Sequence, residues 1–290
     1  MTDAPPLVAE GATEEIGSGV HVIPDRRVEF VPNVGIVVGE RSALVIDTAM
    51  GPRNGETIVR EARRLSGDRK LILTTTHFHP EHAYGAQSFA GEATYVCNAK
   101  QAEELAEKGE PWIEMFSGFG PGLAQLLAEV EIVTPDITYA GERADIDLGG
   151  KRVELHAIDT AHSRGDQVIF LPEERILFAG DLVEDRFLPI FPDEDAVGSR
   201  WLAALDRLEA LRPALVVGGH GEIRDAQMIG DLREYLQTVR DRVAAAHAEG
   251  RQLAEIEETL ERDLGERWSD WDNQMWIRSA VDSFHAELAG

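Results

Sequence analysis

The feature that most constrains this chain is a histidine-rich run over residues 76–82, Thr-His-Phe-His-Pro-Glu-His. Three of the nine histidines of the 290-residue chain fall within six positions of this run. The run directly follows an apolar stretch at residues 70–75, which predicts a buried strand. It therefore begins at the carboxyl end of a strand, where α/β folds commonly place their sites.

The spacing inside the run suits a metal ion. His77 and His79 alternate with a phenylalanine, so in an extended segment both imidazoles project to one side. Pro80 is typical of the first position of a helix, which would put Glu81 and His82 in the first helical turn. Clustered imidazoles with a carboxylate are ligands for zinc, iron or a similar ion. A solvated loop that happens to contain histidines is the alternative interpretation.

Strands with interposed helices are predicted in two successive stretches, which favours a layered α/β fold. No internal repeat or interdomain linker is evident. Strands are expected at residues 19–24, 34–38, 43–47, 70–75, 93–97, 131–133, 137–139, 144–146, 153–158, 168–171, 176–179 and 214–217, and helices at 52–65, from 80, within 98–129 and at 201–211.

The two ends of the chain differ from the part between them. Residues 1–14 are rich in Pro, Ala and Glu, and we expect a flexible N-terminus there. Residues 15–224 hold all the expected strands, and residues 225–290 predict a helical C-terminal extension packed on them, because apolar side chains recur at helical spacing.

Composition excludes some functions. A net charge of −25 repels phosphate backbones, so we expect no nucleic-acid partner. No apolar run is long enough to span a membrane, and the N-terminus has no signal-peptide pattern. The lone cysteine, Cys97, permits no internal disulfide, so a cytoplasmic protein is the simplest expectation. Cys97 ends an apolar strand and is expected to be a buried small hydrophobe.

Four further positions carry ligand-type side chains in distinctive settings. Asp47 ends a predicted strand, His162 lies in Ala-His-Ser-Arg-Gly-Asp, Asp181 in Phe-Ala-Gly-Asp-Leu, and His220 in Gly-Gly-His-Gly. Together with the histidine-rich run, their order and context resemble the motifs of the metallo-β-lactamase superfamily over residues 15–225. The run itself resembles the family pattern H-x-H-x-D-H, with Glu81 in place of the usual aspartate.

The resemblance implies a fold and a set of metal ligands. The fold is an αββα sandwich, two mixed sheets face to face with helices outside. The implied ligands are His77, His79 and His162 for a first metal, His82, His220 and Glu81 for a second, and Asp181 as a bridge. Asp47 more plausibly supports a metal-bound histidine than binds metal itself. Glu81 is either a ligand, a group behind the ligands or a proton acceptor.

The resemblance also implies a function. One or two zinc ions, with iron or manganese as alternatives, would supply a metal-bound hydroxide for hydrolysis of a small-molecule ester, thioester, lactone or lactam. Asp181 and Glu81 are the candidate catalytic carboxylates. An iron-dependent oxidoreductase and a non-catalytic metal-binding scaffold are the alternatives, and a homo-oligomer is possible.

The other histidines lack matching contexts and are expected to be structural: His21, His156, His247 and His285. Five aromatic side chains are candidates either for a pocket lining or for ordinary core packing: Trp112, Phe116, Phe119, Phe187 and Phe191.

Overall fold

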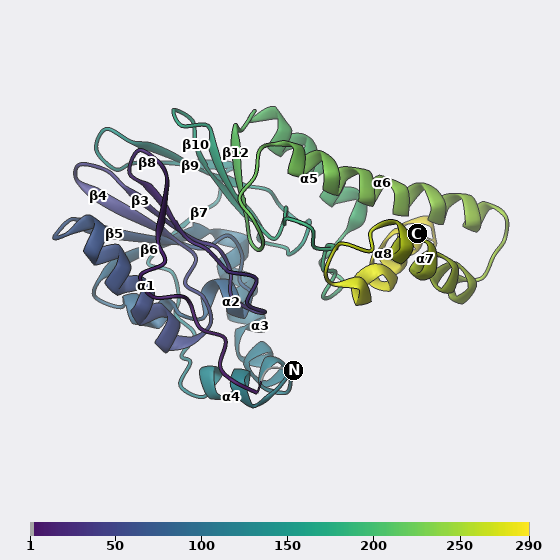
Figure 1. Ribbon diagram of the computed structural model, residues 1–290, viewed down its shortest axis with the longest axis horizontal. Coiled ribbons are helices and arrows are strands. Elements are labelled where there is room, and N and C mark those ends of the chain that lie inside the picture. Colours follow the sequence, from purple (N-terminus) through teal and green to yellow (C-terminus); the bar gives the residue numbers. More distant parts are fainter. Residues whose placement is uncertain (1–2, 290) are drawn as a thin grey trace.

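Two β-sheets pack face to face, and helices cover their outer faces (Figure 1). The computed structural model describes residues 3–289. Within those residues it confirms the expected αββα sandwich with helices after it in the chain. No helix in this part of the chain is long and apolar enough to cross a membrane.

The first sheet has seven strands in chain order among the described residues. Its first three pairings are antiparallel and the next three are parallel. The strands are β1 (Glu14–Gly17), β2 (Val20–Ile23), β3 (Val34–Val38), β4 (Ser42–Ile46), β5 (Lys70–Thr74), β6 (Ala93–Asn98) and β7 (Ile137–Tyr139).

Helices occur in the connections of this sheet, since parallel neighbours need a crossover. Helix α1 (Gly51–Ser66) joins β4 to β5, and α2 (Pro80–Ala83) with the 3₁₀ turn η1 (Ala86–Phe89) joins β5 to β6. Helices α3 (Ala99–Ser117) and α4 (Pro121–Leu127) lie between β6 and β7.

The second sheet has five strands in the described chain, in the order β12-β11-β10-β9-β8. They are β8 (Arg143–Asp147), β9 (Arg152–Ala157), β10 (Gln167–Leu171), β11 (Ile176–Gly180) and β12 (Leu215–Gly218). Only the β11–β12 pair among them is parallel, and α5 (Gly198–Ala210) makes that crossover.

Alternation along the strands divides the core into layers. In β4, Leu44 and Ile46 lie in the cluster between the two sheets, whereas Ala43 and Val45 lie in the cluster under α1. Successive side chains of a strand point to opposite faces, so a continuous apolar strand predicts cover on both sides.

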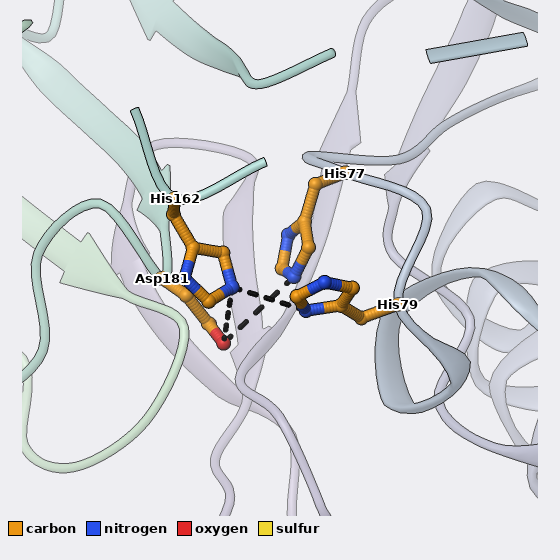
Figure 2. Close-up of side chains that lie close together, drawn as sticks. All are labelled: His77, His79, His162 and Asp181. Atoms are coloured by element: carbon orange, nitrogen blue, oxygen red, sulfur yellow. Dashed lines mark hydrogen bonds and ion pairs between the residues drawn. The ribbon is translucent and has the colours of Figure 1, made fainter. Parts of the chain in front are cut away.

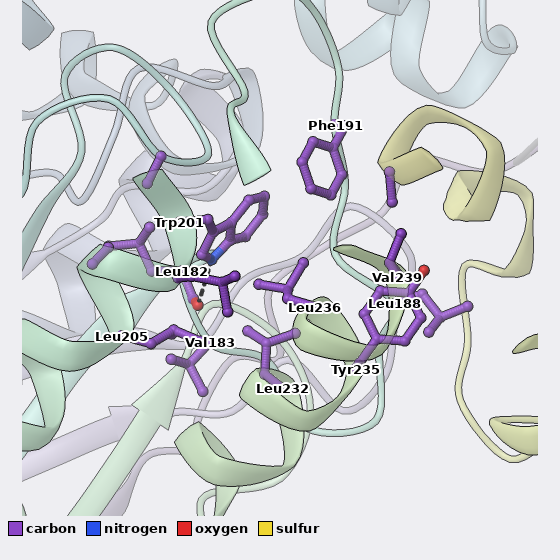
Figure 3. Close-up of a cluster of buried hydrophobic side chains, with 14 of the residues drawn as sticks. Leu182, Val183, Leu188, Phe191, Trp201, Leu205, Leu232, Tyr235, Leu236 and Val239 are labelled. Carbon is purple, nitrogen blue, oxygen red and sulfur yellow. Dashed lines mark hydrogen bonds between the residues drawn. The ribbon is translucent and has the colours of Figure 1, made fainter. Parts of the chain in front are cut away.

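The C-terminal helices share a core with the second sheet. Helices α6 (Gln227–Ala248), α7 (Leu253–Arg267) and α8 (Ile277–Ala289) follow β12, with a 3₁₀ turn η2 (Gln274–Trp276) before α8. Figure 3 shows Leu232 and Leu236 of α6 packed with Trp201 and Leu205 of α5 and with Leu182. The indole N–H of Trp201 donates to the Leu182 carbonyl at 3.1 Å.

The start of the chain lies against α1. The side-chain oxygen of Asn54 accepts from the backbone of Val8 at 3.0 Å, and its amide nitrogen donates to the Pro6 carbonyl at 3.0 Å. Val8 itself is buried. These contacts place residues 6–8 against the domain.

The strands differ from expectation at two places: one expected strand is absent, and one strand was not expected. Residues 131–133 form an irregular segment instead of a strand. The backbone N–H of Glu131 donates to the side chain of Gln87, and Ile132 packs where Gly109 of α3 leaves space, so the apolar pattern there reflects packing on a helix. The second difference is β1, which was not predicted because its sequence, Glu-Glu-Ile-Gly, has no alternating apolar pattern.

Candidate metal centre

The candidate ligands gather where strands of both sheets end. The histidine-rich run follows β5, and Asp47 follows the neighbouring strand β4. His162 lies after β9, Asp181 directly after β11, and His220 after β12. The fold therefore brings together all seven side chains expected as ligands, although they span residues 77–220 of the chain. They form two buried groups that share Asp181.

The first group comprises His77, His79, His162 and Asp181, whose ligand-type atoms all lie within 4.8 Å of one another (Figure 2). His79 Nδ1 is 3.0 Å from His162 Nε2. Asp181 Oδ2 is 3.8 Å from His77 Nε2 and 3.7 Å from His162 Nε2. Three imidazoles and one carboxylate thus point at a common centre.

The second group comprises Glu81, His82, Asp181 and His220, again within 4.8 Å of one another. Here the other oxygen of Asp181 is the nearer one: Oδ1 is 3.1 Å from His82 Nε2 and 3.9 Å from His220 Nε2. Each carboxylate oxygen of Asp181 therefore faces a different group.

Several atoms that face these centres are buried and have no hydrogen-bond partner among residues 3–289. They are His77 Nε2, His82 Nε2, Asp181 Oδ1 and Glu81 Oε2. Although His82 Nε2 and Asp181 Oδ1 are close, they do not meet with hydrogen-bond geometry. Buried polar atoms are almost always paired, so this cluster fits cations that imidazole and carboxylate groups would bind.

Hydrogen bonds behind the cluster orient two of its imidazoles. His82 Nδ1 lies 2.9 Å from Asp47 Oδ2, and His162 Nδ1 lies 3.0 Å from the Ile190 carbonyl. A carboxylate and a carbonyl oxygen can only accept, so Nδ1 is the donor in both contacts and Nε2 of each ring faces the centre. Asp47 thus contacts a histidine of the run, as expected for a supporting group.

Asp47 also fixes the start of the run. Its Oδ1 accepts from the backbone N–H of Thr76 at 2.6 Å, and its Oδ2 accepts from the Thr76 hydroxyl at 3.0 Å. The residue has a φ of 67°, in the left-handed region that aspartate tolerates better than most residues. One carboxylate therefore couples the ends of β4 and β5 to the orientation of His82.

Two glycines leave space that a Cβ would fill, one beside Thr76 and one beside Asp181. Gly180 has a φ of 55°, and a Cβ there would lie 2.6 Å from the Thr76 Cβ. A Cβ at Gly219 would overlap Asp181 Oδ1. Gly180 is therefore required by close approach and by its backbone conformation, and Gly219 by close approach.

Burial and mutual repulsion keep most of the imidazoles uncharged. Burial, followed by the neighbouring histidines, lowers the pKa of His77 well below its usual value. Burial likewise lowers the pKa of His79 and of His162, against the pull of Asp181. Burial acts in the same direction on His82, but Asp181 and Asp47 outweigh it and raise the pKa of that ring. Neutral imidazoles are the form that binds metal.

Glu184 is a site residue that the sequence did not reveal. It is buried, its Oε1 has no hydrogen-bond partner among the described residues, and it lies near Asp181, His82 and Glu81. Burial, then Asp181, raises its pKa well above the usual value for a glutamate. The only sign of Glu184 in the sequence is its position three residues after Asp181. A surface glutamate could equally stand at that position.

The loop before β3 also supports the site unexpectedly. The Asn33 amide donates to the carbonyls of Gly218 and Gly221 at 3.1 and 3.0 Å, and Asp25 Oδ2 accepts from the Gly221 N–H at 2.9 Å. These contacts hold the two sides of His220. Asn33 and Asp25 contact residues almost 200 positions away in the chain, so no local sequence motif marks either of them.

The histidines expected to be structural lie outside both groups. His156 pairs with Glu154 at 2.9 Å, and His247 packs on His285 with ring centroids 5.2 Å apart. His21 is on β2. Cys97 is buried, and burial raises the pKa of its thiol to about 12, which agrees with a packing role.

The five aromatic residues fall into two sets. Trp112 stacks on His79 with ring centroids 4.4 Å apart, and Phe116 and Phe119 continue from it. Phe187 lies 6.0 Å from the His220 ring, whereas Phe191 packs on Trp201 in the core. Four of the five thus lie around the ligand groups, Trp112, Phe116 and Phe119 as a connected set and Phe187 separately, and Phe191 has the core role.

Comparison with known proteins agrees with this geometry. The model of the metallo-β-lactamase superfamily matches residues 27–220. The human acyl-coenzyme A thioesterase MBLAC2 is 28% identical over 219 residues, which cover 68% of this chain and 77% of that protein. A linear primary-alkylsulfatase of a Pseudomonas species is 23% identical over 70% of this chain, which spans 44% of that longer protein.

Solved structures give the same fold. The DIM-1 metallo-β-lactamase, in crystals exposed to ceftazidime, superposes with a TM-score of 0.63 at 20% identity, covering 80% of this chain and 98% of that one. The family match extends over most of the sandwich and includes every candidate ligand. The chain therefore belongs to the metallo-β-lactamase superfamily, among its metal-dependent hydrolases.

Proposed function

We propose that the protein is a two-metal hydrolase that cleaves an ester, thioester, lactone or lactam. The observation that carries this proposal is the position of Asp181, whose two carboxylate oxygens face two separate groups of buried ligand-type atoms. A carboxylate so placed suits a bridge between two ions. Paired ions about 3.5–4 Å apart are a recurrent catalytic arrangement in hydrolases.

In this proposal the ligand-type side chains divide between two ions. His77, His79 and His162 would hold a first ion, and Glu81, His82 and His220 a second. Bound there, the ions would lower the pKa of water toward neutrality and polarise the scissile carbonyl. The chain's own contribution is orientation: Asp47 and the Ile190 carbonyl fix the rings of His82 and His162 before substrate arrives.

Zinc is the proposed native ion, because a set rich in neutral imidazoles suits it. The second group has two carboxylates and two imidazoles, so iron or manganese is the alternative there. Two of the relatives support a carboxylic acyl substrate: MBLAC2 is named as an acyl-coenzyme A thioesterase, and a protein from Bacteroides fragilis as a metallo-β-lactamase.

The remaining parts of the proposal concern the chain's surroundings. The described C-terminal helices contribute no side chain to either ligand group, so residues 225–290 would shape access to the site or association between copies. The strongly negative charge supports a small-molecule substrate over nucleic acid. A buried thiol at Cys97, with no partner cysteine in the sequence, supports a cytoplasmic location.

The test is metal removal and replacement. Protein treated with chelator is reloaded with zinc, manganese or iron, and metal content is measured beside turnover of an ester, a thioester, a lactone and a lactam. We expect two ions per chain and hydrolysis that returns with metal. His162→Ala should lose metal and turnover, whereas His247→Ala, a histidine outside both groups, should keep both.

Two results would overturn the proposal. Full metal content without turnover of any substrate in the panel would favour a non-catalytic scaffold. Iron-loaded protein that consumes oxygen with a substrate but hydrolyses none would favour the oxidoreductase.

A further inference from the structure

A lysine of α3 lies where three segments around the first ligand group meet. Lys108 Nζ is 2.7 Å from Asp193 Oδ2 and 2.7 Å from Asp195 Oδ2. It is also 3.2 Å from Glu104 Oε1, and its side chain is only 16% exposed. Burial lowers the pKa of Lys108, but the bonds to Asp193 and Asp195 outweigh it and raise that pKa above its usual value. The ammonium group therefore stays charged and paired.

Glu104 connects Lys108 to the loop that carries His162. The Glu104 carboxylate is fully buried and accepts from the backbone N–H groups of Arg164 at 3.3 Å and Gly165 at 3.0 Å. The loop also packs against the helix itself, because a Cβ at Gly165 would lie 2.3 Å from an α-carbon of α3. Helix α3 therefore holds the loop two to three positions after His162.

The two aspartates connect Lys108 to the segment that orients His162. Asp193 stands three residues after Ile190, whose carbonyl lies 3.0 Å from His162 Nδ1. Asp193 Oδ1 accepts from the backbone N–H of Asp195 at 3.0 Å, so both carboxylates belong to one turn. Lys108 thus ties this turn to α3.

Lys108 also contacts the histidine-rich run. Its Nζ lies 5.4 Å from the centroid of the Phe78 ring, and Phe78 stands between His77 and His79. A cation over the face of an aromatic ring is attracted to it. The three imidazoles of the first ligand group (Figure 2) come from two segments, and Lys108 contacts one directly and the other through its carboxylate partners.

We propose that Lys108 is a positioning residue for the first ion, because it holds the His162 loop and the Ile190 carbonyl where they aim His162 Nε2 at the centre. This inference rests on the proposed two-metal site. Ile190 lies in an irregular segment, outside any helix or strand. A contact that fixes this segment therefore also fixes the ring that it orients. If Lys108 served only the stability of the fold, its loss would affect both ions alike.

The test measures each ion separately. Wild type and Lys108→Met are titrated with zinc in competition with a chelator, and the ion that is lost in His162→Ala identifies the first group. We expect Lys108→Met to bind that ion roughly 10–100-fold more weakly, as when a group behind a metal ligand is removed. Its affinity for the second ion should equal that of wild type. Equal losses for both ions, or no loss, would overturn the inference.

Lys151→Met is the matched control. Lys151 pairs with Glu174, and its side chain is 13% exposed, close to the exposure of Lys108. It stands just before β9, whereas His162 follows that strand, so the two lie at opposite ends of β9. Lys151→Met should leave the affinity for both ions unchanged. A loss of the first ion as large as that in Lys108→Met would overturn the inference.

A spectroscopic readout follows the orientation of His162 without metal or turnover. NMR of protein with isotope-labelled histidine observes the proton on His162 Nδ1, which is bonded to the Ile190 carbonyl. Lys108→Met should make this proton exchange faster with solvent, because local opening exposes hydrogen-bonded protons. The Nδ1 proton of His82, bonded to Asp47, should keep its wild-type exchange rate. Wild-type protection of the His162 proton in Lys108→Met would overturn the inference.

The aspartate side of the contact gives a second route if Lys108→Met folds poorly. Asp193→Asn with Asp195→Asn removes the same ion pairs at partly exposed positions. This double variant should weaken binding of the first ion as Lys108→Met does. Adding Lys108→Met should cause little further loss, because groups that act as one unit are not additive. Fully additive losses would overturn the inference. None of these measurements uses a substrate, so a failure of the proposed hydrolysis would leave the inference standing.

Discussion

The two halves of the sandwich supply the metal centre in different ways. The first half places four ligand-type side chains within residues 77–82, directly after β5. The second half places one each at His162, Asp181 and His220, on three separate loops. Local backbone geometry therefore arranges the first set, whereas the register of the second sheet and its cover of helices arrange the other.

The difference extends to what holds each half in place. The run is fixed by Asp47, from the adjacent strand. The segment at residues 185–197, whose Ile190 orients His162, is instead braced by the C-terminal region. Leu188 donates to the Asp272 carbonyl at 3.0 Å, and Gly198 donates to Ser283 Oγ at 3.1 Å. A substitution that destabilises the second half should therefore weaken metal binding more than an equally destabilising substitution in the first half.

The largest effect is expected where the two halves meet. Asp181→Asn replaces a carboxylate by a neutral amide, a poorer ligand for both ions. We expect metal content to fall below one ion per chain and turnover to fall by at least about 10³-fold, as for loss of a group that acts in the transition state. Metal analysis with kinetics checks this. Retention of two ions would show that Asp181 does not bridge.

The contacts between the C-terminal region and the second half can be weakened at Phe284. Its ring packs where a Cβ at Gly198 would clash, at the start of α5. Phe284→Ala should lower the free energy of unfolding by about 3–5 kcal/mol and also weaken metal binding. Ile58→Ala, buried under the first sheet, should cost about 2–5 kcal/mol without weakening metal binding. Denaturation with and without added metal measures how strongly each variant binds metal. Equal metal affinities in the two variants would contradict the expected difference between the two halves.

Glu81 sharpens the comparison within the run. If it binds the second ion, Glu81→Gln should lose that ion and Glu81→Asp should keep it, because aspartate retains a carboxylate that can bind the ion. If it only accepts a proton, Glu81→Gln should keep both ions and lose turnover by roughly 10²–10⁴-fold. Metal content measured beside turnover distinguishes these cases. We expect ligation, so unchanged metal content in Glu81→Gln would contradict us.

The smallest effect is expected at an exposed ion pair of the C-terminal region. Arg27 pairs with Asp272 at 2.8 Å, with 35% and 61% of the two side chains exposed. Asp272→Asn should therefore change the free energy of unfolding by less than about 1 kcal/mol, because the backbone contacts of residue 272 persist. A larger loss in thermal denaturation would mean that the charge itself holds the segment at residues 185–197.

Sequence reasoning succeeded where the signal was local. The layered α/β class followed from strands with interposed helices, and the αββα sandwich followed from the family resemblance. All but one of the predicted strands occur, since apolar runs bounded by turn residues need no distant information. It failed at residues 131–133, where an apolar stretch packs on α3 through the gap at Gly109. Such a contact is made across the structure and has no periodic signature.

The sequence by itself determined four of the ligand-type residues, because a histidine-rich run after an apolar strand carries its chemistry and part of its geometry within six positions. The family resemblance identified the other three, His162, Asp181 and His220. Only the tertiary structure decided that the two oxygens of Asp181 face different groups, that Asn33 and Asp25 hold His220, and that Glu184 is buried beside them. The physical reason is the range of the interactions. Strand periodicity is a pattern of residues close together in the chain, so it can be read from the sequence. The position of a buried carboxylate depends on which strands end side by side and on what covers them.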